Sequence, residues 1–216
     1  MIDLLPLGDR GMLARFATES EAADWAAEVV RQRWDGVIDV VPAYQSVAVF
    51  ADPERVGWDL LESRLRDLPV TGSIVNGGRL IRLPVLYEGA DLSEVAHQLK
   101  LSESAVIAHH SGREYRVFAL GFQPGFPYAG YLPESLSGLP RRKEPRLRVP
   151  AGSVAIVGRQ TGVYPVESPA GWHLLGRTPL RIVDVAHEYF PIRAGDRLRF
   201  EPISAAEYES RLGEQL

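Results

Sequence analysis

The segment from Gly121 to Pro179 limits the possible folds of this 216-residue chain more strongly than any other part of it. It holds nine of the 16 prolines and nine of the 20 glycines. Proline lacks the backbone N–H that a helix interior needs, and glycine at this density marks turns, so no long helix can form here. The segment therefore predicts ordered loops joined by brief strands, for which a closed or nearly closed β-barrel is the natural container.

The second part of the chain predicts further strands and two helices around this segment. Ile81, Leu83, Val85 and Tyr87 recur at every second position and predict one face of a strand. In residues 197–201, Leu198 and Phe200 point inward while the charged side chains between them face water. Strands are expected at 81–87, 115–120, 153–157, 180–184 and 197–201, and short helices at 91–99 and 102–110.

The first part of the chain predicts a separate small α+β domain. Thr18 and Glu21 have capping-box spacing at the start of an amphipathic stretch. Asp52-Pro53 supplies an N-cap and a first helical residue with preset φ. The expected elements, in the order ββαββα, are strands at 4–7 and 12–16, a helix at 19–34, strands at 37–41 and 46–50, and a helix from Asp52 to Leu68. Asn76-Gly77-Gly78 marks the boundary, so we expect domains at 1–78 and 79–216.

The composition excludes several classes of protein. The chain has no cysteine, which rules out disulfides, thiol nucleophiles and cysteine-bound metals. The formal net charge of −4 disfavours general affinity for nucleic acid. Asp3 stands where a signal peptide needs a base, and no stretch approaches the ~20 apolar residues of a membrane span. We expect a cytoplasmic protein with neither nucleic acid nor a membrane as partner.

Two apparent motifs in the expected helices have simpler interpretations. Residues 94–107 have the spacing of a helix-turn-helix, but Glu103 and Ser104 stand where a DNA-reading helix presents Arg, Asn or Gln. This favours two packed helices over DNA binding. His109 and His110 lie ~100° apart on a helix and cannot easily converge on one metal ion. No metal site is expected, and one of the two is better interpreted as a polar site residue or a helix-end cap.

Residues 141–148 form the one dense basic patch. They are either a solvated face or a cation cluster that attracts a phosphate, a carboxylate or an acidic partner, and both interpretations stay open. The sequence has no phosphate-binding loop, no dinucleotide-binding glycine motif and no Gly-x-Ser-x-Gly elbow. If ATP is used, another chain is expected to contribute much of its site.

Three rigid segments, at residues 121–128, 158–165 and 168–179, are the candidates for carrying chemistry. Loops braced by proline hold donors at set positions, which suits the binding of small polar ligands. Phe122 and Phe126 are expected to fill the barrel core. The polar ends of Tyr128, Gln160 and Trp172 need partners.

These segments, with Pro140-Arg141-Arg142, residues 149–156 and residues 195–200, resemble the family of KipI, PxpB and allophanate hydrolase subunit 1. The resemblance covers essentially the whole chain and is strongest to the B subunits of prokaryotic 5-oxoprolinase. It implies a small α+β N-terminal domain followed by a cyclophilin-like β-barrel domain. It also implies a relation to the carboxyltransferase domain of urea carboxylase, in which corresponding modules are fused.

The resemblance further implies a function in a complex. The chain would pair with two other 5-oxoprolinase subunits, the KipA-like C subunit and the A subunit, to open 5-oxo-L-proline to L-glutamate with ATP hydrolysis. It would be inactive alone, with ATP bound with or by the partner subunits. Two alternatives stay open: a KipI-like inhibitor of a sensor histidine kinase, and a prolyl isomerase suggested by the barrel alone.

5-Oxoproline, urea and the ureido ring of biotin are small planar amides, and attack at such a group places charge on the carbonyl oxygen. We hypothesise one pocket on the barrel that faces a partner protein and supplies donors to this oxygen. The proposed catalytic residues are His110, Tyr128, Gln160 and Arg177. The proposed substrate-binding residues are Gln123, Thr161, Tyr164 and Trp172, with Arg142 and Arg146 holding a carboxylate or a phosphoryl group.

Overall fold

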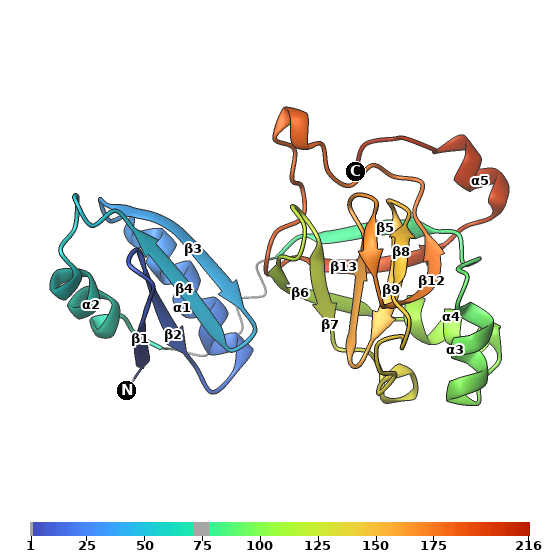
Figure 1. The fold of residues 1–216 in the computed structure, drawn as a ribbon, viewed down its shortest axis with the longest axis horizontal. Coiled ribbons are helices and arrows are strands. Elements are labelled where there is room, and N and C mark those ends of the chain that lie inside the picture. The colour runs from blue at the N-terminus through green and yellow to red at the C-terminus, as the bar shows by residue number, and fades with distance from the viewer. Residues whose placement is uncertain (1, 71–77) are drawn as a thin grey trace. The chain divides into compact units, whose positions relative to one another are not determined.

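The computed structural model describes residues 2–70 and 78–216. The chain divides into two compact units, Met1–Gly77 and Gly78–Leu216 (Figure 1). The division falls within the glycine pair at which the sequence predicts a domain boundary.

The first unit contains a four-stranded antiparallel sheet in the order β1-β2-β4-β3, with the first helix packed on β3 and β4. Trp25 of that helix is fully buried in one cluster with Val47 and Val49 of the sheet, as is Leu61 of the second helix. The elements are β1 (Asp3–Leu7), β2 (Gly11–Arg15), α1 (Glu19–Gln32), β3 (Val37–Ala43), β4 (Ser46–Ala51) and α2 (Trp58–Asp67). They follow the predicted order of elements.

The starts of the two helices confirm one prediction and correct another. Thr18 accepts a hydrogen bond from the Glu21 N–H at 3.2 Å, and Glu21 accepts one from the Thr18 N–H at 3.1 Å, so the capping box is present. Helix α2 begins at Trp58, so the predicted start at Asp52-Pro53 is wrong. Asp52 instead begins a separate turn, in which its carboxylate accepts from the Glu54 N–H at 3.0 Å.

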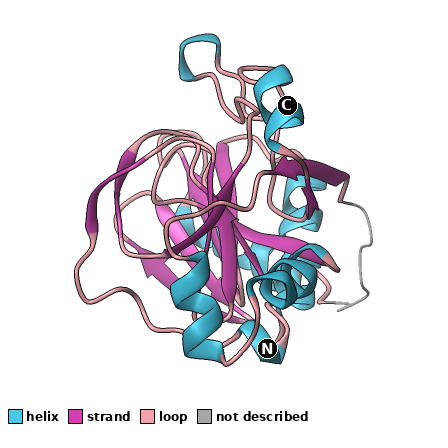
Figure 2. Cartoon of the chain, turned by 90° about the vertical axis from the view of Figure 1, so that its right-hand side faces the viewer, coloured by secondary structure: helices cyan, strands magenta, loops and turns pink. Residues whose placement is uncertain are grey.

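The second unit is built on a seven-stranded, barrel-like sheet in the order β12-β9-β10-β7-β6-β13-β5. Strands cross its centre, with loops and short helices around them (Figure 2). The elements are β5 (Leu80–Val85), α3 (Leu92–Leu99), α4 (Glu103–Ser111), β6 (Glu114–Leu120), β7 (Pro127–Gly130), η1 (Glu134–Leu136), β8 (Arg146–Val149), β9 (Ser153–Val157), β10 (Gln160–Val163), β11 (Ser168–Ala170), β12 (His173–Arg177), η2 (Val185–His187), β13 (Arg197–Pro202) and α5 (Ala205–Ser210). Strands β8 and β11 form a separate two-stranded ribbon.

A backbone bridge joins the two edges of the barrel sheet. Leu86, directly after β5, exchanges two hydrogen bonds of 2.9 Å with Arg177 at the end of β12. The two segments of backbone approach each other closely here. A Cβ atom on Gly176 would lie 2.5 Å from the carbonyl oxygen of Leu86, and a Cβ atom on Gly89 would lie 2.3 Å from the carbonyl oxygen of Leu174. Closure of the barrel therefore requires glycine at these positions.

Helices α3 and α4 pack on each other, and α4 also contacts β13 and η1. Val106 and His110 of α4 are fully buried. The face of α4 that carries Val106 and His110 packs inside the second unit. This agrees with the prediction of two packed helices in place of a DNA-binding helix-turn-helix.

Residues 180–184 do not form the predicted strand. Arg181 donates from its N–H to the Glu214 carbonyl at 2.8 Å in an isolated bridge. Leu180 and Ile182 are buried in the main cluster of the unit. Leu180, Ile182 and Val183 belong to a loop that covers the core, so the apolar residues here indicate burial and not a strand.

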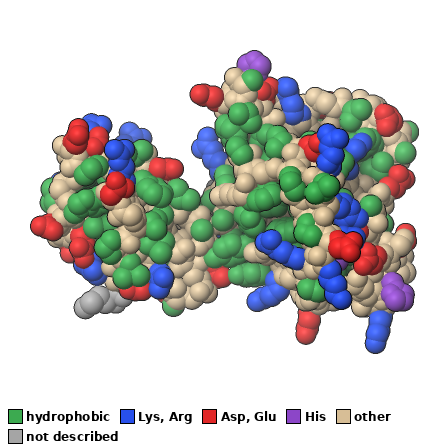
Figure 3. All heavy atoms as spheres, in the orientation of Figure 1, with side chains coloured by type: hydrophobic (Ala, Val, Ile, Leu, Met, Phe, Trp, Pro, Cys, Tyr) green, Lys and Arg blue, Asp and Glu red, His purple; other side chains and the backbone are tan. Residues whose placement is uncertain are grey.

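Charged side chains of both signs are interspersed on the visible face of each unit (Figure 3). Within the described ranges, no helix combines the length and the apolar character needed to cross a membrane.

Replacing Gly176 with Ala is expected to lower the free energy of unfolding of the second unit by about 1–3 kcal/mol, because the new methyl group clashes with the closing strand. Gly121→Ala is the control, since a Cβ there meets only Tyr128 at an ordinary 3.7 Å. Urea unfolding followed by circular dichroism measures both variants. Equal stability of G176A and the wild type would contradict the close approach.

Candidate functional site

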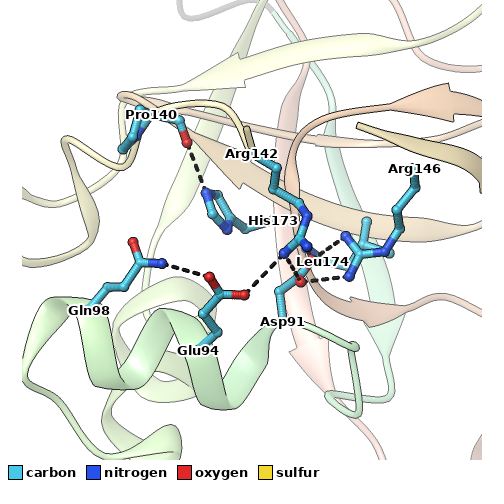
Figure 4. Close-up of polar contacts among 8 residues, drawn as sticks. All are labelled: Asp91, Glu94, Gln98, Pro140, Arg142, Arg146, His173 and Leu174. Atoms are coloured by element: carbon cyan, nitrogen blue, oxygen red, sulfur yellow. Dashed lines mark hydrogen bonds and ion pairs between the residues drawn. The ribbon is translucent and has the colours of Figure 1, made fainter. Parts of the chain in front are cut away.

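A buried carboxylate, that of Asp91, is the centre of a cluster of charges in the second unit (Figure 4). Arg146 donates to it through both Nη atoms, at 2.7 and 2.8 Å. Arg142 donates through Nη1 at 2.6 Å, and the backbone N–H of Leu174 donates at 2.7 Å. Asp91 is only 1 % exposed, so these donors replace the water that an ionised carboxylate requires.

A second carboxylate extends this cluster to helix α3. Glu94 accepts from Arg142 Nη1 at 3.0 Å and from Gln98 at 2.9 Å. The nearby His173 bonds the Pro140 carbonyl through Nε2 at 2.8 Å (Figure 4). Two arginines and two carboxylates balance in charge, so these four side chains together are neutral.

The backbone positions Asp91 for this contact. Asp91 N–H donates to the Leu174 carbonyl at 3.1 Å, which ties the segment before α3 to strand β12. Its carboxylate does not cap helix α3, because the arginines and Leu174 use it instead. Asp91 was expected only as a helix start. A lone acid 51 residues from its arginine partner gives no sequence signal for an ion pair.

Next to Arg142 lies a hollow of about 230 Å³ with aromatic walls. Phe126 and Trp172 meet edge to face with ring centroids 5.5 Å apart, and Tyr128 lies 5.9 Å from Trp172. The aromatic residues that line it are Phe122, Phe126, Tyr128, Tyr164 and Trp172. Perpendicular rings of this kind form a rigid apolar surface for a small flat molecule.

Arginines supply the polar part of this aromatic hollow. Arg141 and Arg142 line it, and the buried Nε of Arg142 has no hydrogen-bond partner among the described residues. Burial raises the pKa of Tyr164. The charge of Arg141 partly offsets this increase and Tyr128 adds to it, so the Tyr164 hydroxyl stays protonated. The hollow thus combines flat apolar walls with two arginine side chains in its lining.

A second hollow, of about 330 Å³, lies where Leu86 and Arg177 join the two edges of the barrel sheet. This junction is called the barrel seam below, and the hollow is called the seam hollow. Arg146, Arg148 and Arg177 line it, as do Ser153 and Tyr208. Arg177 Nε bonds the Tyr208 hydroxyl, and its guanidinium lies 5.1 Å from the centre of that ring. Arg146 lines this seam hollow and Arg142 the aromatic one, so Asp91 links the two.

His110 belongs to a buried chain of hydrogen bonds. Its Nε2 lies 2.8 Å from the Thr161 hydroxyl, which itself donates to the Ala155 carbonyl at 3.1 Å. Nε2 therefore carries the proton, and Nδ1 accepts from the Tyr87 hydroxyl at 2.7 Å. Burial lowers the pKa of His110 to about 3, and burial raises that of Tyr87.

The structure corrects the expectation of one shared pocket. Trp172 lines the aromatic hollow, Arg177 lines the seam hollow, and Gln160 lines neither. His110 was predicted to be a catalytic residue at this pocket. It is fully buried and both of its ring nitrogens are hydrogen-bonded, so it does not border a pocket. Thr161 is likewise fully buried in the same chain of hydrogen bonds.

The other predicted site residues are divided between the same places. The aromatic hollow contains Tyr128, Arg142, Tyr164 and Trp172, and the seam hollow contains Arg146 and Arg177. Gln123 lies on the loop of residues 120–125, where its buried Oε1 has no partner within the described ranges. Arg142 and Arg146 bind Asp91, so the carboxylate that the sequence predicts for them is present within the chain.

Comparisons with known proteins give a consistent result. The family model for the carboxyltransferase domain, subdomain C and D, matches residues 2–191. The 5-oxoprolinase B subunit of Escherichia coli O157:H7 is 46% identical over 171 residues, 77% of this chain and 78% of that protein. The 5-oxoprolinase B subunit of Bacillus subtilis (strain 168) is 37% identical over 229 residues, 94% of each.

Solved structures extend the comparison to larger proteins. That of TTHA0988 is 41% identical and has a TM-score of 0.80 over 91% of this chain. This chain spans 40% of the length of TTHA0988. The Kluyveromyces lactis urea carboxylase has a TM-score of 0.68 at 16% identity, over 97% of this chain and 22% of its own, a likeness of fold alone.

Replacing Asp91 with Asn is expected to lower the free energy of unfolding by about 3–5 kcal/mol, because it leaves the partly buried Arg146 without a counter-charge and Arg142 with only the half-exposed Glu94. Glu94→Gln is the matched control. Glu94 binds the same Arg142 from a half-exposed position, so its loss is expected to cost at most about 1 kcal/mol. Urea unfolding measures both. Equal costs for the two variants would show that the buried contact has no special weight.

Replacing His110 with Gln is expected to change how stability depends on pH. In the wild type, the unfolded histidine binds a proton below its ordinary pKa of 6.5, but the folded one does so only near pH 3. Acid therefore favours the unfolded wild type across this window. Between about pH 6 and 4 the free energy of unfolding is expected to fall by up to about 1.4 kcal/mol per pH unit more for the wild type than for H110Q.

Urea unfolding at several pH values measures this slope. His97→Gln, at an exposed position on α3, controls for the loss of a histidine. Parallel pH profiles for H110Q and the wild type would mean that His110 is not held neutral.

Proposed function

This chain belongs to the family of 5-oxoprolinase B subunits, which carries the carboxyltransferase subdomains C and D, and we propose from this that it is the B subunit of an ATP-dependent 5-oxoprolinase. The complex hydrolyses 5-oxo-L-proline to L-glutamate. The observation that carries this proposal is 46% identity to a protein of that name over more than three quarters of both chains. The name of these relatives implies a multi-subunit complex and supports a role in a hydrolase.

The aromatic hollow has the chemistry that such a substrate needs. 5-Oxoproline is a flat five-membered lactam with a carboxylate. The edge-to-face rings of Phe126, Tyr128 and Trp172 offer a surface on which the lactam ring stacks. The carboxylate then pairs with the guanidinium groups of Arg141 and Arg142, which line the hollow. This arrangement places the ring against apolar walls and its charge against a guanidinium.

Hydrolysis of the lactam places negative charge on the carbonyl oxygen while water adds to the carbonyl carbon. A preorganised donor at that oxygen lowers the barrier. In this proposal Tyr128 is that donor, because its side chain lines the aromatic hollow. Further donors and the water come from a partner protein that covers the hollow, which makes the chain inactive by itself.

The remaining parts of the proposal concern partners and fold. The A subunit and a KipA-like C subunit complete the enzyme, and ATP is bound with or by them. The second unit is a cyclophilin-like barrel that follows a small α+β domain, and the complex works in the cytoplasm. The KipI-like kinase inhibitor is not favoured, because the curated relatives carry the name of an enzyme subunit.

Co-expression of this chain with candidate A and C subunits tests the proposal. 5-Oxoproline-dependent ATP hydrolysis is expected only when all three chains are present, because each supplies part of the site. Phosphate release measures the rate. Undiminished activity of the other two chains without this one would refute the proposal, as would inactivity of the complete complex.

In the active complex, Trp172→Ala is expected to raise the KM for 5-oxoproline about tenfold, the effect of losing ~1.4 kcal/mol of stacking. Trp172→Phe keeps a ring and is expected to recover most of the affinity. Phe190→Ala removes a partly exposed aromatic ring outside the hollow and serves as the control. An unchanged KM in W172A would place the lactam elsewhere.

A further inference from the structure

The seam hollow contains cationic and hydroxyl groups that the lactam site does not use. Arg177 is its least compensated cation: within residues 2–70 and 78–216, no carboxylate lies within 4.0 Å of its guanidinium. Arg146 also lines the hollow but is neutralised by Asp91. Arg148 pairs with Glu167 at 2.9 Å, an exposed contact that water and salt weaken.

Two hydroxyl groups lie beside Arg177. Ser153 pairs with Arg177 across strands β9 and β12, so the two side chains are neighbours. Ser153 is only 3 % exposed and lines the hollow, and its hydroxyl bonds no other described residue. Its Oγ reaches the hollow and is not enclosed, so this hydroxyl is available to a ligand there.

Tyr208 supplies the second hydroxyl and fixes the guanidinium. Its oxygen accepts from Arg177 Nε, which leaves the phenolic proton free to donate. Tyr208 is 3 % exposed, and its ring lies against the guanidinium, so the remaining Arg177 N–H groups are held in place. A guanidinium and two O–H groups thus converge on one small volume.

We propose that the seam hollow is a binding site for a small oxyanion, held by Arg177, Ser153 and Tyr208. All three groups are donors, and an oxyanion offers acceptors on every side. Glu88, which also lines the hollow, limits the size of the anion, because a larger one would meet its carboxylate. The proposal goes beyond the lactam site and does not depend on it. The anion is either a phosphate, such as the product of ATP hydrolysis, or a carboxylate.

Isothermal titration of the whole chain with inorganic phosphate, and separately with acetate, tests the site at constant ionic strength. Saturable binding with a Kd in the millimolar range is expected for one of the two anions. The tighter anion identifies the source, phosphoryl or carboxylate. Arg177→Gln is expected to weaken binding at least tenfold, and Ser153→Ala several-fold, because each removes a donor.

Arg199→Gln makes the same change of charge on β13, away from the hollow, and is expected to leave the Kd unchanged. Circular dichroism checks that each variant folds. The absence of saturable binding to either anion would overturn the proposal. Equal weakening by R177Q and R199Q would also overturn it, because it would show attraction to net charge alone. Neither result bears on whether the assembled complex hydrolyses 5-oxoproline.

Discussion

The buried carboxylate of Asp91 ties the second unit together. Its four hydrogen bonds come from three places within the glycine- and proline-rich segment: Arg142 before β8, Arg146 in β8 and Leu174 in β12. A carboxylate without water must keep all of its donors, so these segments cannot separate independently. The rigidity expected of the glycine- and proline-rich segment therefore comes from an ion cluster as well as from proline itself.

This cluster also determines what the two hollows offer. Arg142 is held at its Nη1 by Asp91 and Glu94 while its side chain lines the aromatic hollow. Arg146 binds Asp91 through both Nη atoms, which leaves Arg177 as the principal cation at the seam. One internal carboxylate thus binds an arginine from each of the two hollows, the aromatic one and the more polar one at the seam. The proposed enzyme uses the first, and the second is available for a separate anion.

The sequence predicted local structure well and tertiary structure only in part. The capping box at Thr18 and the strand at residues 197–201 depend on neighbours in the chain, and both are present. The helix start at Asp52 was wrong because a turn competes for the same cap. The strand at 180–184 was wrong because a buried loop can carry the same short apolar run as a strand, here Leu180, Ile182 and Val183. The candidate site shows the same limit: Trp172 and Arg142 do share one hollow, yet His110 completes a hydrogen-bond chain inside the core. Strand register decides which side of the barrel wall a residue faces. The strands between residues 121 and 179 are too short for their sequence to show this register.

Arg177 has two independent roles at the seam. Its peptide group pairs with Leu86 and joins the sheet edges, while its side chain lines a solvent-accessible hollow. Any residue with an ordinary extended backbone could perform the first role. Related barrels could therefore carry a different side chain at this position, and so prefer a different ligand, while the backbone bridge that closes the barrel stays intact.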